Sequence, residues 1–345
     1  MTFTFSGALS VRGFDVSVTL APGETVAVLG PNGAGKSTLL NLTAGLLRAD
    51  SGRAVLDDTV LFDTAGGVFT PPHLRGVSML AQEALLFPHL SVLENVAFGP
   101  RSAGVARADA RDTARHWLGE VEALDLADRR PAQLSGGQAQ RIAVARALAS
   151  DPKLLLLDEP MAALDVSVAP ALRRMLRRVL VGRTVLIVTH DILDAYTLAD
   201  RVIVVDDGNI VEQGATRDLL ERPRSRFTAG LAGVNLLAGV RSERGIRLDD
   251  GSEIAGVSTL AVGLGAAAAV RPSTVRVSLD EPVSANRLRG EVLDLEPRGD
   301  LVRVRSRRLS ADLTPALVAD LDLAPGAMVW FAFDEGDVNI YAAAD

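Results

Sequence analysis

The first half of the chain alternates between short apolar runs and longer segments with helical spacing. Residues 14–20 alternate apolar and polar positions, as a strand with one buried face does, and residues 25–30 form a continuous apolar run. Residues 36–47 carry apolar side chains at helical spacing, and residues 77–82 form an apolar run that ends in a glutamine. This pattern predicts strand, strand, helix and strand, in that order.

Two further apolar runs, KLLLLDEP and TVLIVTH, have strand length and end in acidic or imidazole side chains. Apolar strands that alternate with helices predict a parallel sheet covered on both faces, an α/β fold, whose ligands bind beyond the carboxyl ends of the strands. The polar residues at these ends are Gly30, Gln82, Asp158, Glu159 and His190. We therefore expect a site along one edge of this sheet.

The region between these strands has a helical pattern. Ser91 and Glu94 have the spacing of a capping box that opens a short helix. Residues 107–126 are rich in Ala and Arg and predict an amphipathic helix. We expect a helical insertion over about residues 88–150.

Past Arg222 the pattern changes. Residues 221–235 resemble a linker, and short alternating runs such as GIRL, LVRVRS and MVWFAF follow, with turn residues between them. They predict a small all-β domain with barrel character. The apolar stretch at residues 254–270 has only 17 residues, rich in Ala and Gly, so packed strands and turns are expected there and not a membrane span. The predicted domains are residues 1–230 and 236–345.

Composition narrows the function classes. The chain has 345 residues and a net charge of −7, which argues against a nucleic-acid partner. It has no cysteine, so disulfides and thiolate metal sites are excluded. MTFTFSGALS lacks the basic start and apolar run of a secretory signal. Lysine occurs only at Lys36 and Lys153, and the other basic side chains are arginines. Lys36 lies in a glycine-rich segment, which indicates that this position needs a compact ammonium group rather than a planar guanidinium.

The segment GPNGAGKST lies between a predicted strand and a predicted helix and matches the phosphate-loop pattern. Glycines there allow backbone amides to approach phosphates. Lys36 is expected to neutralise the β- and γ-phosphates, Ser37 to offer its hydroxyl to Mg²⁺, and Thr38 to help at the α-phosphate. The residues expected around the nucleotide are Gly30, Pro31, Asn32, Gly33, Ala34, Gly35, Lys36, Ser37 and Thr38.

The polar strand ends supply the expected catalytic groups. Asp158 is placed to hold Mg²⁺ through water, and the neighbouring Glu159 can orient or deprotonate the attacking water. His190 is expected to donate to the γ-phosphate or its water. Gln82 is a further polar residue at a strand end, and Asp165 is expected to be a helix N-cap, a part of the site, or both.

A second glycine-rich helix start, LSGGQ, begins at Leu134. Small side chains at Ser135, Gly136 and Gly137 leave backbone amides open to an anion. A guanine-nucleotide switch protein would carry Asn-Lys-x-Asp, which is absent, and a small-molecule kinase has no use for LSGGQ. A ring-forming ATPase would leave that segment unexplained as well.

With these motifs in order, residues 1–230 resemble the ABC transporter ATPase family, a phosphate-loop NTPase fold. The resemblance identifies Gln82 as the Q-loop, which would serve in catalysis and as a metal ligand beside Ser37 and Asp158. It assigns Ser135, Gly136, Gly137 and Gln138 to the signature, ALD with Asp165 to the D-loop, and His190 to the switch. It implies ATP and Mg²⁺ as cofactors. It also implies a head-to-tail dimer, in which the signature of one subunit closes over the ATP of the other.

Within the family, residues 70–99 resemble the ATPases of molybdate importers, and the C-terminal third resembles their TOBE, molybdate-binding-protein-like domain, an OB-like β fold. The resemblance implies an ATP-hydrolysing subunit on the cytoplasmic face of the cell membrane, bound to a separate permease and served indirectly by a solute-binding protein. Sulfate, iron and polyamine importers share much of this pattern. A soluble ABC ATPase of DNA repair or translation would need tandem halves, a coiled coil or a basic face, and a purely regulatory module would not need Glu159 and His190.

Two departures from the family pattern carry expectations of their own. The family stacks an aromatic residue of its first strands on adenine, and because no Tyr or Trp precedes Trp117, Phe14 is the candidate here. The final strands of the resembling C-terminal segment carry Asp334, Glu335 and Asp337, where neutral or positive groups would surround an oxyanion. We therefore expect residues 236–345 to serve dimer contact and not molybdate sensing.

Overall fold

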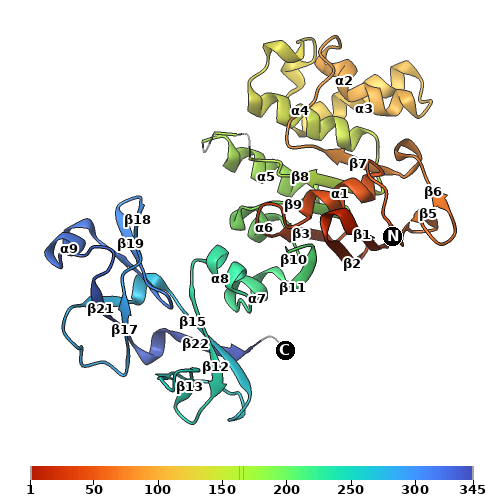
Figure 1. Ribbon diagram of the computed structural model, residues 1–345. Helices are drawn as coiled ribbons and strands as arrows, with labels where there is room; N and C mark the ends of the chain where they lie inside the picture. Colours follow the sequence, from red (N-terminus) through yellow and green to blue (C-terminus); the bar gives the residue numbers. More distant parts are fainter. Residues whose placement is uncertain (1, 163, 166, 344–345) are drawn as a thin grey trace. The chain divides into compact units, whose positions relative to one another are not determined.

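The computed structural model describes residues 2–162, 164–165 and 167–343 (Figure 1). The chain forms two compact units, Met1–Thr216 and Arg217–Asp345. The division lies earlier in the chain than the predicted change of domain at residues 230–236. The intervening residues form two short helices, α7 (Thr216–Glu221) and α8 (Arg226–Ala232).

A mainly parallel six-stranded sheet forms the centre of the first unit. Its strands are β11 (Asn209–Ala215), β10 (Arg201–Asp206), β3 (Thr25–Leu29), β9 (Val185–Val188), β8 (Leu154–Asp158) and β7 (Val77–Leu80), in spatial order. All neighbours pair in parallel except the edge pair β10 and β11. The predicted parallel sheet is therefore confirmed, with its strand ends at one edge.

The apolar strands of this sheet are buried on both faces. In β8, Leu154 and Leu156 pack into one core together with helix α1 (Lys36–Ala44). Leu155 and Leu157 pack into a second core on the other face, together with apolar residues of the helices within 92–149 and 169–179. Successive side chains of a strand point to opposite faces, so a strand covered on both sides needs an unbroken apolar run. This is the physical reason for the run LLLL.

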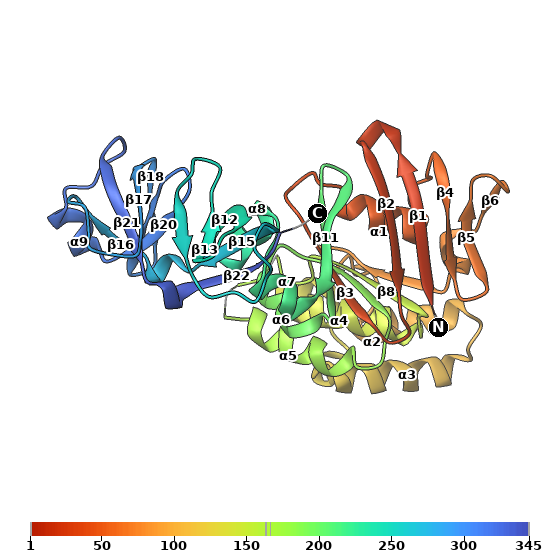
Figure 2. The same ribbon diagram turned by 90° about the horizontal axis from the view of Figure 1, so that it is seen from below.

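An antiparallel sheet covers the α1 side of the first unit (Figure 2). Its strands are β2 (Phe14–Leu20), β1 (Phe3–Leu9), β4 (Ser51–Leu56), β5 (Thr59–Asp63) and β6 (Val68–Phe69), in spatial order. In β1 and β2 every second residue is buried, as the alternating pattern predicts. The inward side chains, Phe3 and Phe5 among them, join the same core as α1.

Three helices form the predicted insertion, drawn in gold and yellow in Figure 1: α2 (Val92–Ser102), α3 (Arg107–Glu120) and α4 (Gly136–Ala149). The hydroxyl of Ser91 caps α2 by accepting from the amide of Glu94 at 3.3 Å. The capping box is only half formed, because the Glu94 carboxylate instead binds the guanidinium groups of Arg101 and Arg111. Two remaining helices, α5 (Ala169–Val179) and α6 (Ile192–Leu198), lie between the later strands.

A buried arginine closes the C-terminal end of α1. Arg75 is 1% exposed, and its Nη1 donates to the carbonyls of Leu42 and Thr43 at 2.9 and 2.8 Å. The helix dipole concentrates negative partial charge at these carbonyls, so a cation is stabilised there. Burial lowers the pKa of the Arg75 guanidinium to about 10. The guanidinium therefore stays charged at neutral pH and stabilises the C-terminal end of α1.

The second unit is largely β-structure, as predicted. One sheet contains β14 (Glu253–Ala255), β13 (Gly245–Arg247), β12 (Asn235–Arg241), β15 (Gly265–Val270) and β22 (Val338–Ala342), in spatial order. Two three-stranded sheets follow: β16 (Arg276–Ser278), β21 (Met328–Phe333) and β17 (Asn286–Glu291), then β18 (Asp294–Arg298), β19 (Leu301–Arg305) and β20 (Ser310–Leu313). The short helix α9 (Pro315–Asp320) comes after β20.

The predicted linker at residues 221–235 is wrong in part, because it contains helix α8. Ser225 caps this helix by accepting from the amide of Thr228 at 3.1 Å, and Gly233 ends it with φ of 67°. A cap residue and a terminal glycine are helix signals that the polar, glycine-rich composition conceals. The stretch at 254–270 forms strands and turns, and no helix in the described chain is long and apolar enough to cross a bilayer.

Candidate functional site

The loop between β3 and α1 places six residues, 30–35, at the carboxyl end of the central sheet. Gly33 and Gly35 have φ of 84° and 102°, a left-handed conformation that side chains rarely adopt. At Gly30 the limit is space, because a Cβ would lie 2.1 Å from the carbonyl oxygen of Val205. The glycines predicted from the motif are thus required by backbone shape at two positions and by close packing at the third.

Lys36 forms the base of this loop. It is 6% exposed, and its Nζ donates to the carbonyls of Gly30 and Pro31 at 2.8 and 2.9 Å. An ammonium group has three donors, so these two bonds leave one for a ligand. Burial lowers the pKa of Lys36, and the nearby carboxylates of Glu159 and Asp158 oppose that shift. A buried cation surrounded by carbonyls and positive-φ glycines fits a phosphate group.

A cavity of about 400 Å³ opens over this loop. Of the predicted residues, Asn32, Gly33, Gly35, Lys36, Ser37, Thr38 and Glu159 line it. Arg12 also lines it and was not predicted. Helix α1 begins behind Gly35 without any side-chain cap, so no side chain competes for the first-turn amides that face an incoming anion.

Asp158 and Glu159 end strand β8 beside the loop. The pKa of Asp158 is raised mainly by burial and next by the charge of Glu159, while a hydrogen bond from Ser37 and the charge of Lys36 oppose the rise. Glu159 has φ of 45°, a strained backbone conformation for a residue other than glycine, and its amide donates to the carbonyl of Val188 at 2.9 Å. Glu159 also lines the cavity over the glycine loop.

His190 follows strand β9 and lies against Glu159. Its Nδ1 is 3.3 Å from Oε2 of Glu159, and the imidazole is 62% exposed whereas the carboxylate is 19% exposed. Strands β8 and β9 are hydrogen-bonded neighbours, with Asp158 opposite Val188. The sequence therefore predicted correctly that these two strand ends would meet.

A buried ion-pair network behind His190 was missed from the sequence. Arg173 of α5 donates to the carboxylate of Asp194 at 2.6 Å and to that of Asp191 at 2.9 Å. Thr189 donates its hydroxyl to Asp194 at 3.0 Å. Burial raises the pKa of Asp194, and its bonds to Arg173 and Thr189 oppose that shift. The network fixes the turn that carries His190, but its partners lie on separate elements and follow no motif.

Gln82 and Asp165 lie outside the cavity lining. Gln82 comes two residues after β7, is exposed, and leaves the sheet at the same edge as Asp158, because Leu80 pairs with Leu157. Asp165 is exposed and is not the cap of α5, whose N-cap is Val168. The helix-cap interpretation of Asp165 is therefore wrong. Ala163, the first residue of the ALD segment, lies outside the described residues.

The second glycine-rich helix start also lies outside the cavity lining. Ser135 caps α4 by accepting from the amide of Gln138 at 3.3 Å, and the Gln138 side chain accepts from the amide of Ser135 at 3.0 Å. Gly136 is exposed, and a Cβ there would meet nothing within 4 Å. One turn further, the buried Gln140 donates to the carbonyl of Pro160 at 3.0 Å, which ties α4 to the segment that follows Glu159.

The prediction that Phe14 stacks on a base is wrong. Its ring is 1% exposed and packs edge-on against Phe5 at 6.4 Å between centroids. A Cβ at Gly35 would lie 2.9 Å from this ring, so Phe14 supports the glycine loop from within. The alternating pattern of β2 points this side chain into the core, where no ligand reaches it.

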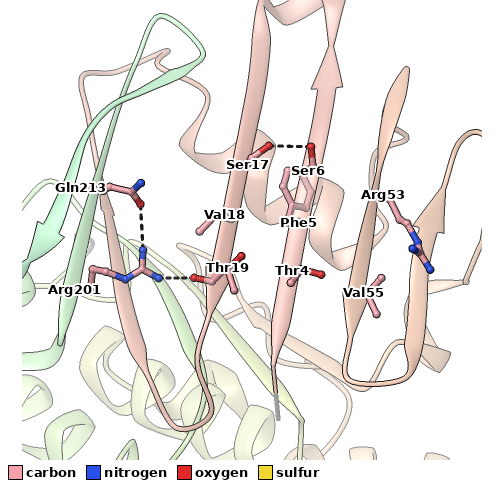
Figure 3. A pocket seen from close by; sticks show the side chains of 10 residues that line it. All are labelled: Thr4, Phe5, Ser6, Ser17, Val18, Thr19, Arg53, Val55, Arg201 and Gln213. Atoms are coloured by element: carbon pink, nitrogen blue, oxygen red, sulfur yellow. Dashed lines mark hydrogen bonds between the residues drawn. The ribbon is translucent and has the colours of Figure 1, made fainter. Parts of the chain in front are cut away.

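A separate hollow of about 640 Å³ lies on the outer face of the antiparallel sheet, between β1, β2 and β4 and the ends of β10 and β11 (Figure 3). Its most prominent cation, Arg201, donates to the carbonyl of Thr19, to Gln213 and to the carboxylate of Glu24. The guanidinium is thus occupied by structural partners. None of the predicted site residues lines this hollow, so the cavity over the glycine loop remains the candidate site.

Two family models match the chain. The ABC transporter model matches residues 14–162, which include the glycine loop, Asp158 and Glu159. The TOBE domain model matches residues 284–340 in the second unit. Both the expected ATPase fold and the expected C-terminal domain are confirmed by these matches.

The chain is 46% identical to the molybdenum import ATP-binding protein ModC of Mycobacterium tuberculosis strain H37Rv, over 96% of this chain and 95% of that protein. It is 37% identical to the putrescine transport ATP-binding protein PotG of Escherichia coli K12, over 92% and 86% of the two chains. A dimeric post-hydrolysis structure of the ATP-binding cassette MJ0796 bound to ADP and Pi matches with a TM-score of 0.53 and 30% identity, over 63% of this chain and 99% of that one. The chain belongs to the family of ABC import ATP-binding subunits, which hydrolyse ATP to drive transport.

Proposed function

We propose that this subunit powers the uptake of molybdate. The observation that carries the proposal is the similarity to a molybdenum import protein at 46% identity over nearly the whole of both chains, against 37% for the putrescine relative. An importer of sulfate, iron or a polyamine is the alternative, because ATP-binding subunits of importers for those solutes are also similar to this chain.

The glycine loop binds the triphosphate of ATP in this proposal. The third donor of Lys36 and the uncapped amides of α1 face the β- and γ-phosphates, and Thr38 lies further along α1, on the α-phosphate side. Ser37 would hold Mg²⁺ by its hydroxyl and Asp158 through water, and the ion would neutralise charge on the phosphates. No cluster of three His, Asp or Glu side chains that could hold a metal occurs among the described residues.

Glu159 acts on the attacking water. As a base it accepts a proton while the water oxygen bonds to the γ-phosphorus and the bond to the bridging β–γ oxygen breaks, which yields ADP and phosphate. His190, which lies 3.3 Å from Glu159, donates a hydrogen bond to the oxygens of the γ-phosphate while it is transferred to water. Gln82 leaves the same sheet edge and joins the metal side of the site.

The signature segment acts on the nucleotide of a second copy. Ser135, Gly136, Gly137 and Gln138 line no part of the cavity in their own chain, and Ser135 and Gly136 are exposed. They are therefore available to close a nucleotide held by the loop of another subunit. Asp165, also exposed, lies at the same interface in this proposal. Closure of two ATP sites, and reopening on hydrolysis, would drive the transport cycle.

An apolar surface beside Gln82 supports a membrane permease as partner. Leu85 and Phe98 are 63% and 45% exposed, and the rings of Phe87 and Phe98 lie 4.6 Å apart. Arg146 of α4 holds this segment by donating to the carbonyls of Ala84 and Leu85 at 3.0 and 2.8 Å. Exposed apolar side chains that gather on one surface, here from the loop after β7 and from α2, are typical of a docking surface. The subunit would sit peripherally at the cytoplasmic face of the membrane, with a solute-binding protein acting on the far side of the permease.

Reconstitution of the ATPase with its permease in lipid vesicles tests the substrate. We expect hydrolysis to be stimulated by the solute-binding protein loaded with molybdate, and not by the same protein mixed with sulfate, ferric iron or putrescine. Stimulation by one of the other solutes alone would replace molybdate with that solute and leave the importer function intact.

The second unit is proposed to serve dimer contact and not to sense molybdate. Four arginines lie close in sequence to its final strands and could offset their carboxylates: Arg303, Arg305, Arg307 and Arg308. Three of them are already paired, because Arg303 binds Asp312 at 2.7 Å, Arg305 binds Glu296, and Arg308 binds Asp250. Only Arg307 of that group has no ion pair in the described chain. A doubly charged anion needs cations in excess of nearby carboxylates.

Calorimetric titration of the full chain with sodium molybdate checks this expectation. We expect no heat of binding at micromolar concentrations. Sodium sulfate in the same buffer is the control for general anion effects. Saturable micromolar binding of molybdate that is lost on Arg307→Ala would contradict the proposed role of this unit.

A further inference from the structure

The nucleotide cavity has no aromatic ring among its described lining residues. Lys36 and the backbone amides of the loop, at the base of the cavity, would bind the triphosphate. A purine base extends beyond the phosphates and needs a flat surface of its own, since base stacking stabilises binding by about 1–3 kcal/mol per base. Phe14, the nearest ring of β2, is covered by Gly35 and is closed to ligands.

Arg12 lies at the rim of this cavity. It ends a 3₁₀ turn, Ser10–Arg12, between β1 and β2, and Gly13 with φ of 58° turns the chain into β2. Its Nη1 donates to the hydroxyl of Thr38 at 3.0 Å, which places the guanidinium over the first turn of α1. Arg12 is exposed, whereas Lys36 is buried at the base of the same cavity.

The guanidinium of Arg12 has one hydrogen-bond partner among the described residues, the hydroxyl of Thr38. Across the described part of the chain Arg12 forms no ion pair, whereas Arg173 and Arg201 in the same unit each bind a carboxylate. One of five guanidinium donors is taken by Thr38, and the two faces of the planar group are left for a ligand. Guanidinium planes stack on aromatic faces and are weakly hydrated, so they do so at a smaller desolvation cost than an ammonium group.

We propose that Arg12 lays its guanidinium plane on the adenine ring of bound ATP and so replaces the missing aromatic platform. This inference rests on the proposed binding of ATP at the glycine loop. It makes Arg12 a base-binding residue, distinct from Lys36, which binds phosphate. The contact with Thr38 fixes the side of the loop on which the base lies, over the first turn of α1.

Titrations of the full chain with MgATP and with magnesium tripolyphosphate test the proposal, since tripolyphosphate has the phosphates and no base. The variants are Arg12→Ala, Arg12→Lys and Arg12→Tyr, and the matched control is Arg53→Ala, an exposed arginine on the outer sheet face that pairs with Asp63 at 3.4 Å. Arg12→Ala should weaken ATP binding about tenfold and leave tripolyphosphate binding unchanged. Arg12→Tyr should restore ATP binding, and Arg12→Lys should not.

Other outcomes overturn the inference in distinguishable ways. Equal loss of ATP and tripolyphosphate binding in Arg12→Ala, or rescue by Arg12→Lys and not by Arg12→Tyr, would make Arg12 a phosphate ligand. Unchanged ATP binding in Arg12→Ala, with normal wild-type affinity, would remove Arg12 from the site and leave the proposed function standing. A wild-type chain that binds tripolyphosphate and ATP equally weakly would overturn both. Thermal unfolding of each variant shows whether it is folded.

Discussion

The helices α1 and α4 both begin with glycine-rich segments, yet their N-termini differ in what satisfies them. At α1 the preceding residue is Gly35, no side chain caps the first turn, and a buried lysine stands beside the open amides. At α4 Ser135 and Gln138 cap one another, and Ser135 and Gly136 are exposed. A free helix N-terminus attracts anions, and a reciprocal cap partly removes that attraction.

This difference indicates that the start of α1 binds phosphate within its own chain, whereas the start of α4 is arranged to contact another molecule. The α1 end is ready to bind phosphate within one chain, since no side chain caps its first turn and Lys36 keeps one donor beyond its bonds to Gly30 and Pro31. The α4 end is stable in the absence of a ligand and must exchange its own cap for contacts brought by another molecule. A dimer that closes over ATP would supply that molecule, and the self-cap would keep the exposed segment ordered until then.

The largest effect is expected at the α1 end. Lys36→Ala should weaken ATP binding by at least about 100-fold, because it removes the buried cation and leaves bound phosphate unpaired. Equilibrium titration with ATP measures the change. Lys153→Ala is a matched control at the only other lysine, which is exposed and 3.7 Å from Asp57. Wild-type affinity in the Lys36 variant would mean that the α1 end does not bind phosphate.

Glu159→Gln should keep ATP binding and slow hydrolysis by about 100-fold or more, because an amide cannot accept the proton from water. The trapped ATP should then hold two copies together, which makes the α4 end of each copy a measurable part of the site. Size-exclusion chromatography with ATP and Mg²⁺ checks this. A variant that remains monomeric and hydrolyses ATP at the normal rate would refute both the role of Glu159 as the base and the dimer that closes over ATP.

Mixing two inactive variants separates the two helix ends. Lys36→Ala damages the α1 end and Ser135→Arg the α4 end, so each homodimer should be inactive. In a mixed dimer one site combines the intact loop of one chain with the intact signature of the other. Recovery of up to about a quarter of the wild-type rate is expected, since half of the dimers are mixed and each has one intact site. A Ser135→Arg homodimer with full activity would place the α4 end outside the site.

The smallest effect concerns the self-cap of α4 in the free chain. Ser135→Ala should lower the free energy of unfolding by about 1 kcal/mol, because the amide that Ser135 satisfies loses its acceptor. Thermal unfolding without nucleotide measures this loss, and Ser102→Ala at the last residue of α2, far from any N-cap, is the control. Equal stability of Ser135→Ala and wild type would show that the reciprocal cap contributes nothing before dimer closure.

Much of the site was predictable because its residues are close together in the sequence. Residues 30–38 specify a loop by glycine spacing alone, and the DEP segment follows an apolar run that only a buried strand explains. The meeting of Asp158, Glu159 and His190 followed from one rule, that parallel strands end at one edge. The sequence likewise determined the helical insertion and the β-rich second unit, which depend on local periodicity.

Only the tertiary structure decided which side chain stands beside the base-binding end of the cavity. Phe14 is the better stacking residue by type, but its position in an alternating strand buries it against Phe5, while the exposed Arg12 reaches Thr38 across 26 positions of sequence. The network of Arg173 with Asp191 and Asp194 is equally long-range. Local patterns record how a segment folds, whereas contacts between distant segments depend on packing that no single segment encodes.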